Sequence, residues 1–313
     1  MISGETLDRI RARIFRFDPD TDAEPRYETY EVPWTPRMRV LEVLDYVNET
    51  LAQDVAYRWF CGVKKCGTCA VSVNGSPALA CWEPAQAEMT IEPLRSLPVV
   101  RDLVTEREPY EAWLRRMGPL LVRREPYDRF PEPLSHTDMA PSAHLRDCIQ
   151  CLACYAACPV VEQPDSGFAG PAPLVALAEL ALDPRDALDR AKLAAEEAQV
   201  FKCVSCYECE RVCPAGIPIV GEAIEPLKRR AFARGEGAGA HHAQVFLDVV
   251  KAYGWVNAPK LVLGSKGLSG AALRTGLRMV VRGKVKPLQM LLGRPSDGAE
   301  TIRKLYESTE RDG

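Results

Sequence analysis

Twelve cysteines in three groups of four constrain this 313-residue chain more than any other feature of its sequence. The first group has the spacing C-x4-C-x2-C-x11-C and consists of Cys61, Cys66, Cys69 and Cys81. The other two groups repeat the spacing C-x2-C-x2-C-x3-C-P, from Cys148 to Pro159 and from Cys203 to Pro214. No cysteine is left over, so we interpret each group as a set of metal ligands rather than as disulfide partners.

The first group has the spacing of a plant-type [2Fe-2S] site, in which three ligands lie on one loop and a fourth comes from a following strand. Such a loop must direct backbone N–H groups at the sulfurs, and Gly62 and Gly67 permit the tight turns that this requires. A zinc site is the alternative, but zinc ribbons favour two C-x2-C pairs with a longer insert. We predict a [2Fe-2S] cluster on Cys61, Cys66, Cys69 and Cys81.

The second and third groups match the run of bacterial two-cluster ferredoxins, in which the fourth cysteine of each run binds the other cluster. We therefore predict two [4Fe-4S] clusters with crossed ligand sets. The first set is Cys148, Cys151, Cys154 and Cys213, and the second is Cys158, Cys203, Cys206 and Cys209. Three one-electron centres make the chain an electron relay. The sequence has no dinucleotide, Walker or Ser/His/Asp motif, so we expect the two-electron centre on a partner.

The overall composition is that of an ordinary globular chain. Lys and Arg total 40 against 43 Asp and Glu, and the resulting formal charge of -3 does not indicate a nucleic-acid binder. No apolar run reaches the roughly 18 residues of a membrane-spanning helix, and no signal peptide opens the chain. We expect a cytoplasmic chain with reduced thiols. The rival hypothesis from another class is a zinc-stabilised interaction module.

The pattern of apolar residues predicts an α+β chain. Strands are expected at 11–17, 27–32, 70–73 and 89–92, with an amphipathic helix from Val40 to Val47. Helices are expected at 173–182 and 184–200, the second capped by Asp183. The predicted domains are a [2Fe-2S] β domain at 1–106, a connector at 107–140, a helical two-cluster domain at 141–235 and a basic helical tail at 236–313.

The tail combines positive charge with helical periodicity. From Lys260 to Arg294 there are eight basic residues and no acidic one. Arg274, Arg278 and Arg282 recur at i, i+4 spacing beside Leu273, Leu277 and Val281. This pattern predicts a basic amphipathic helix, which would rest on an anionic membrane surface, dock to an acidic partner or simply face solvent.

Beyond the cysteine spacing, the sequence resembles the iron-sulfur subunit of succinate dehydrogenase and fumarate reductase over about residues 10–220. The shared motifs include Cys66-Gly67-Thr68-Cys69, Leu79-Ala80-Cys81, Glu92-Pro93-Leu94 and Asp183-Pro184-Arg185-Asp186. The resemblance implies a β-grasp ferredoxin domain followed by an all-α ferredoxin domain. It also implies an FAD-containing flavoprotein partner that oxidises succinate or reduces fumarate. Electrons would pass from the flavin to the [2Fe-2S] cluster and then through the two cubanes.

Departures from the family concern the third centre and its surroundings. The family has a non-cysteine residue at the position of Cys206 and a [3Fe-4S] cluster there, so we predict [4Fe-4S] here, or [3Fe-4S] if Cys206 is not a ligand. Val160, Val161, Glu162 and Val204 stand where the family has a Trp and a His near its quinone, which argues against the ordinary quinone site.

The region after Cys213 resembles the C subunit of heterodisulfide reductase. The second partner is therefore a membrane-anchor subunit or a cysteine-rich, heterodisulfide reductase-like subunit, and the complex would lie on the inner face of the cell membrane. The alternative function is a relay for another dehydrogenase or a heterodisulfide reductase-like complex.

Overall fold

The computed structural model describes residues 8–127, 129–267, 270–283 and 293–311. The chain divides into two compact units, one up to Leu227 and one from Lys228 onward. The first unit holds all twelve cysteines.

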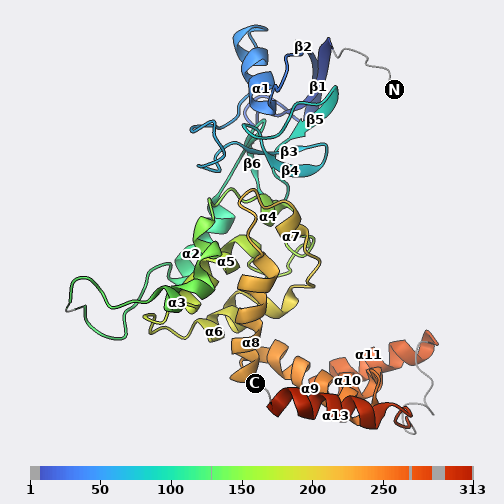
Figure 1. The fold of residues 1–313 in the computed structure, drawn as a ribbon. Helices are drawn as coiled ribbons and strands as arrows, with labels where there is room; N and C mark the ends of the chain where they lie inside the picture. The colour runs from blue at the N-terminus through green and yellow to red at the C-terminus, as the bar shows by residue number, and fades with distance from the viewer. Residues whose placement is uncertain (1–7, 128, 268–269, 284–292, 312–313) are drawn as a thin grey trace, which may run out of the picture. The chain divides into compact units, whose positions relative to one another are not determined.

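The N-terminal part of the first unit is a five-stranded mixed sheet with strand order β2-β1-β5-β3-β4 (Figure 1). Strands β1 and β5 pair in parallel, and the other neighbours are antiparallel. The strands are β1 (Arg9–Arg16), β2 (Arg26–Pro33), β3 (Ala70–Val73), β4 (Ser76–Leu79) and β5 (Glu88–Glu92). Alternate residues of β1 are buried because its side chains point in turn to the two faces of the sheet.

Helix α1 (Val40–Glu49) buries Val40, Val43, Leu44 and Val47 on one side, and these residues belong to the same hydrophobic core as the sheet. Their helical spacing explains why one face of α1 becomes apolar. The Glu42 side chain accepts a hydrogen bond of 2.7 Å from the Arg39 N–H and so caps the helix start. The expected strands and helix of this domain are confirmed, apart from shifts of one or two residues at their ends.

A short hairpin of β6 (Val99–Arg101) and β7 (Val104–Thr105) follows the sheet. Between its strands lies Asp102, which is buried and pairs with the equally buried Arg16 of β1 at 3.1 Å. Asp102 also accepts hydrogen bonds from the N–H groups of Phe17 and Ala56. A buried carboxylate with this many donors fixes the segment that leads to the first cysteine loop.

From Glu108 onward the described part of the first unit is mainly helical, and the helical character predicted for the two-cluster region is confirmed. Its α-helices are α2 (Glu108–Met117), α3 (His136–Met139), α4 (Ala153–Ala156), α5 (Pro171–Ala181), α6 (Arg190–Lys192), α7 (Glu208–Arg211) and α8 (Glu225–Ala233), the last of which runs into the second unit. Two π-helical segments, Leu193–Glu197 and Ile219–Ile224, and three 3-10 turns, Ala140–Ser142, His144–Asp147 and Val200–Lys202, complete it. The apolar helix α5 lies at the centre and is buried on nearly all sides.

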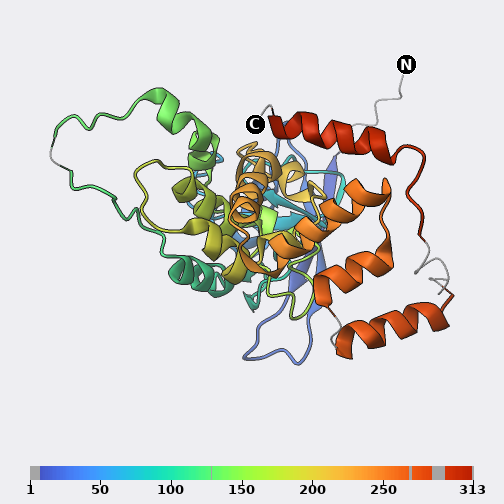
Figure 2. The ribbon, with the colours of Figure 1, turned by 90° about the horizontal axis from the view of Figure 1, so that it is seen from below.

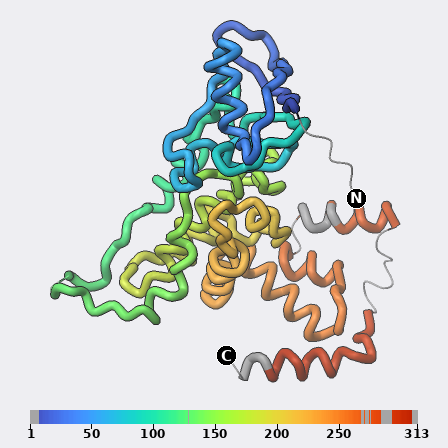
Figure 3. The backbone as a smooth tube through the Cα atoms, turned by 45° about the horizontal axis from the view of Figure 1, so that its top comes forward, coloured from blue at the N-terminus to red at the C-terminus, as the bar shows by residue number. Residues whose placement is uncertain are grey.

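The predicted helix at 184–200 is only partly correct, because 184–189 is not helical and helical turns occupy 190–197. The chain turns at Asp183, whose carboxylate holds Arg185 instead of capping a helix, and a short helix begins only after Asp189. The buried Arg190 pairs with Asp186 and donates to carbonyls at and after the end of α2, among them Met117 O at 2.6 Å and Gly118 O at 2.7 Å. These hydrogen bonds fix the start of the long loop between α2 and α3, which extends from the body of the unit in Figure 3. Within the predicted connector, α2 is a helix that the sequence analysis did not identify.

The second unit consists of helices. The described helices are α9 (Gly237–Tyr253), α10 (Ala258–Lys266), α11 (Gly270–Val281) and α13 (Ala299–Arg311) (Figure 2). Both α10 and α13 pack on α9, and α11 packs on α10. Among the described residues, no helix has the length and apolarity that crossing a bilayer requires. The part of the basic tail at 284–292 lies outside the described residues.

Candidate metal centres

Cys61, Cys66 and Cys69 lie on the loop between α1 and β3, and Cys81 follows β4; the backbone of the loop wraps around the sulfurs. Sγ of Cys61 accepts hydrogen bonds of 3.3–3.4 Å from the N–H groups of residues 63, 65 and 66. Sγ of Cys81 accepts one of 3.4 Å from Lys64. Left-handed backbone at Gly62, Lys64 and Gly67 produces these turns. Such donors stabilise cluster thiolates and raise the reduction potential, so the loop fits an iron-sulfur core.

Two sulfurs of this group, Cys66 and Cys69, differ in how readily they ionise. Burial opposes ionisation of Cys66, but hydrogen bonds from Thr68 and Cys61 outweigh it and lower the pKa of Cys66 to about 6. Burial raises the pKa of Cys69 to about 12, and the neighbouring thiolates of Cys81 and Cys66 act in the same direction. The hydrogen bonds of the Cys66 and Lys64 N–H groups to Cys61 and Cys81 hold these sulfurs around one loop, and a positive metal core there would favour the thiolate forms.

A second site is an apolar cavity lined by one cysteine from the third group and three from the second. These are Cys148, Cys151, Cys154 and Cys213. Burial raises the pKa of Cys154 well above its ordinary range, and the thiolates of the other three also raise it. The remaining walls come from apolar side chains such as Val175 and Ile219. The structure thus brings Cys213 to the partners that the crossed ligand pattern predicts, and its role as a ligand stays a prediction.

The last four cysteines gather in the same crossed manner. Burial raises the pKa of Cys158, with Cys203 and Cys206 as neighbours that raise it further. Burial also raises the pKa of Cys209 to about 12, and Cys203, Cys158 and Cys206 contribute. Cys206 is exposed, whereas Cys158 and Cys209 are buried. Cys206 therefore lies with the other three sulfurs and faces outward.

Both four-iron motifs adopt the same local backbone. Gln150 and Leu152 are left-handed in one motif, and Ser205 and Tyr207 are left-handed at the equivalent positions of the other. Short helices α4 and α7 begin directly after Leu152 and Tyr207 and contact each other. The sequence repeat is therefore also a structural repeat.

The thiol chemistry of the sites fits metal-sulfide cores. All twelve cysteines are free thiols. Those with raised pKa values must lose their protons to bind metal, so cluster binding releases protons and stabilises the fold. In the part of the chain that the structure describes, no three His, Cys, Asp or Glu side chains converge as a single metal ion requires. An iron-sulfur cluster contains several irons, and its thiolates bind different irons, so its ligands need not converge on one point.

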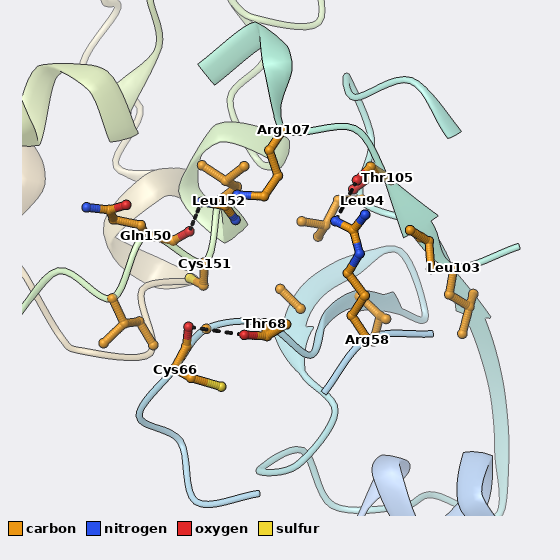
Figure 4. Close-up of a pocket in the computed structure, with 15 residues that line it drawn as sticks. Arg58, Cys66, Thr68, Leu94, Leu103, Thr105, Arg107, Gln150, Cys151 and Leu152 are labelled. Atoms are coloured by element: carbon orange, nitrogen blue, oxygen red, sulfur yellow. Dashed lines mark hydrogen bonds between the residues drawn. The ribbon is translucent and has the colours of Figure 1, made fainter. Parts of the chain in front are cut away.

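The loop of the first site meets the loop of the second site at the buried Gly67. Figure 4 shows the neighbouring residues Cys66 and Thr68 of the first loop beside Cys151 of the second. A Cβ atom at Gly67 would lie 2.6 Å from Ile149 O and 2.9 Å from Cys151 Cβ. Beside this junction is a cavity of about 210 Å³. Its wall includes Arg58, which donates to Thr105 O, and Arg107, which donates to Gln150 O. The junction is not evident from the sequence, because a glycine in a cluster loop indicates a turn and not which residues the turn contacts.

Two family descriptions match this chain. Residues 11–112 match a 2Fe-2S iron-sulfur cluster binding domain, and residues 144–217 match a 4Fe-4S dicluster domain. These descriptions agree with one two-iron site and a pair of four-iron sites.

Relatives of known name point to one kind of complex. The chain is 32% identical over 247 residues to the fumarate reductase iron-sulfur subunit of Mycobacterium tuberculosis, covering 74% of this chain and all of that protein. It is 36% identical to one of the subunits of the fumarate reductase (CoM/CoB) of Methanothermobacter marburgensis, covering 74% of this chain and 45% of that protein. The chain spans less than half the length of the first three curated relatives that it matches.

A solved structure supports the same assignment. A chain of the Mycobacterium smegmatis Sdh1 complex in the apo form has a TM-score of 0.68 and 30% sequence identity to this protein. The match covers 72% of this chain and 96% of that one. The sheet and the helical two-cluster region are therefore an architecture found in solved complexes.

Proposed function

Because the chain belongs to the family of iron-sulfur subunits of fumarate reductase and succinate dehydrogenase, we propose that it relays electrons for an enzyme that interconverts succinate and fumarate. The observation that carries the proposal is the direct packing of one cysteine loop on the next at Gly67 and Cys151. Bound iron-sulfur clusters each take up and release one electron. The protein's part is to hold the thiolates in series and to exclude solvent between them.

The entry side of the relay is the exposed face around the first cysteine loop. Phe60 is 82% exposed, and Trp59, Val63 and Trp82 are at least half exposed. Lys64 lies over the Trp82 ring, with its Nζ 5.3 Å from the ring centroid. Contiguous exposed apolar side chains with a basic neighbour mark a protein interface. We assign this face to an FAD-containing flavoprotein.

The exit side is the loop that carries Cys206. Val204 and Tyr207 flank this thiol, and both are more than half exposed. The gathering of Cys206 with Cys158, Cys203 and Cys209 favours a third centre of the [4Fe-4S] type over [3Fe-4S]. We place the second partner here, either a membrane-anchor subunit or a cysteine-rich, heterodisulfide reductase-like subunit. Through these partners the complex would lie on the inner face of the membrane.

A second candidate function is a relay for a heterodisulfide reductase-like complex. The observation that favours it is the fourth thiol, Cys206, at the third centre. Under this alternative the complex would neither oxidise succinate nor reduce fumarate.

The test is anaerobic purification of the chain with its partners, followed by assays of succinate-dependent dye reduction and fumarate reduction. Iron far in excess of zinc and three EPR-active centres in a reductive titration are expected. Phe60→Glu should abolish co-purification of the flavoprotein and with it succinate-dependent reduction. Phe130→Glu is the matched control, because Phe130 is 92% exposed but lies between α2 and α3.

Activity with neither substrate in a complex that retains all its clusters would reject the succinate–fumarate assignment. Equal loss of the flavoprotein from both phenylalanine variants would reject the proposed docking face. A colourless, zinc-rich protein would reject the relay itself and favour the interaction module.

A further inference from the structure

Helix α11 in the second unit shows an apolar row that its neighbour α10 does not cover. Its half-buried residues Gly276, Met279 and Val280 lie on one side of the helix. Leu277 and Val281 lie on another side and are 67% and 78% exposed. Since residues four apart stack on one helix face, these two side chains form a continuous exposed strip.

A row of arginines borders this strip. Arg274, Arg278 and Arg282 follow each other at successive turns and are exposed. Within the described residues, none of the three has an ion pair, and residues 260–294 of the sequence contain no acidic side chain that would provide one. The arginines therefore keep their charge available for an external anion.

The two rows together suit an interface between water and hydrocarbon. Residues one position apart on a helix are separated by about 100° around its axis, so each arginine emerges beside the apolar strip. Helices of this pattern lie in the plane of a bilayer surface, with apolar side chains at the acyl boundary and basic ones at lipid phosphates. We propose that α11 binds directly to the surface of a membrane that contains anionic lipids.

The uniform positive charge of residues 260–294 favours an anionic membrane surface over a folded protein as the binding partner of α11. A typical protein surface carries charges of both signs, and a helix that binds it gains from carrying both as well. The surface of an anionic bilayer carries many negatively charged lipid headgroups. These headgroups complement a stretch with eight basic and no acidic residues. The proposal does not depend on the reaction that the relay serves.

The test is co-sedimentation of the full chain with vesicles of phosphatidylcholine alone and of phosphatidylcholine mixed with phosphatidylglycerol. We expect binding only to the mixed vesicles, weakening as salt is added. A variant with Gln at the three positions 274, 278 and 282 should bind about 100-fold more weakly, since each basic residue near an anionic surface contributes a factor of about five. Leu277→Gln combined with Val281→Gln should also weaken binding.

The control carries the same loss of charge at Arg37, Arg95 and Arg303, which are exposed elsewhere on the chain. It should bind the mixed vesicles as the native chain does, and circular dichroism should be unchanged in every variant. Equal binding by the arginine variant and the control would overturn the proposal. So would binding to an acidic protein with none to mixed vesicles, which would assign α11 to a protein partner.

Discussion

Replacement of Gly67 by alanine is the sharpest perturbation of the relay, because it adds one carbon atom at the contact between two cysteine loops. The new Cβ would lie 2.6 Å from Ile149 O, whereas ordinary contacts begin at 3.4 Å. The loops must therefore separate by the difference, about 0.8 Å, or distort around the methyl group. Both outcomes weaken the junction through which electrons would pass.

Gly62 provides a matched control in the same loop. Its φ of 68° is almost that of Gly67 at 70°, so alanine suffers the same backbone strain at either position. A Cβ at Gly62 would meet nothing within 4 Å, however. We expect Gly62→Ala to cost about 1 kcal/mol for the left-handed backbone alone. Gly67→Ala should cost about 2–4 kcal/mol, since overpacking adds to the same strain.

The two variants are compared by heating under anaerobic conditions, with visible absorption as the measure of cluster retention, and by EPR of the reduced protein. Gly67→Ala should lose its clusters at a lower temperature than Gly62→Ala and should show weaker magnetic coupling between the first two centres. Electron transfer between them should slow, because tunnelling falls steeply with distance. Identical behaviour of the two variants would refute the role given to this contact.

Three further predictions concern other parts of the first unit. Cys206→Ser should convert the third centre from [4Fe-4S] to [3Fe-4S] in the EPR spectrum, and an unchanged spectrum would exclude Cys206 as a ligand. Asp102→Asn should destabilise the sheet domain by about 1–3 kcal/mol in thermal or denaturant unfolding, because it removes the buried carboxylate partner of Arg16 and leaves that guanidinium only Glu28 and Asp54. Asp54→Asn removes an exposed partner of the same guanidinium and should cost less than about 1 kcal/mol; similar losses for both variants would contradict this reasoning. The hydrogen bond to Glu222 raises the pKa of His144, so this pair stabilises the fold below the ordinary histidine pKa of about 6.5 and is lost as pH rises through the higher folded value. NMR titration should show that shift, and Glu222→Gln should remove it.

The sequence predicted the fold class and the family because the cysteine spacing reflects local backbone geometry. Each cysteine motif specifies its own local backbone. It includes a left-handed residue, Gln150 in one motif and Ser205 in the other, and a short helix follows in each. Strand alternation in β1 and helical spacing in α1 are equally local. The α+β architecture and the resemblance to the family are confirmed by the structure and by the relatives.

What the sequence did not predict depends on contacts between distant residues. The helix expected at 184–200 begins only at Arg190, because Asp186 and Arg190 hold the chain at the end of α2. Helix α2 was missed because only Tyr110 and Met117 of its ten residues are buried, which leaves little apolar periodicity. The approach of Gly67 to Cys151 joins two loops more than 80 positions apart, and no local pattern records it.

Burial of the sulfurs varies along the series in a way that suits a relay with two partners. The cavity of the middle site is lined mainly by apolar side chains, and burial there raises the pKa of Cys154 well above its ordinary range. At one end Phe60 is exposed next to the first loop, and at the other end Cys206 is an exposed thiol. A relay needs partner access at its ends and protection from water and oxygen in the middle. The same exposure makes Cys206 the position at which a bound cluster would lose a corner iron most easily, and the partner proposed for this end would protect it.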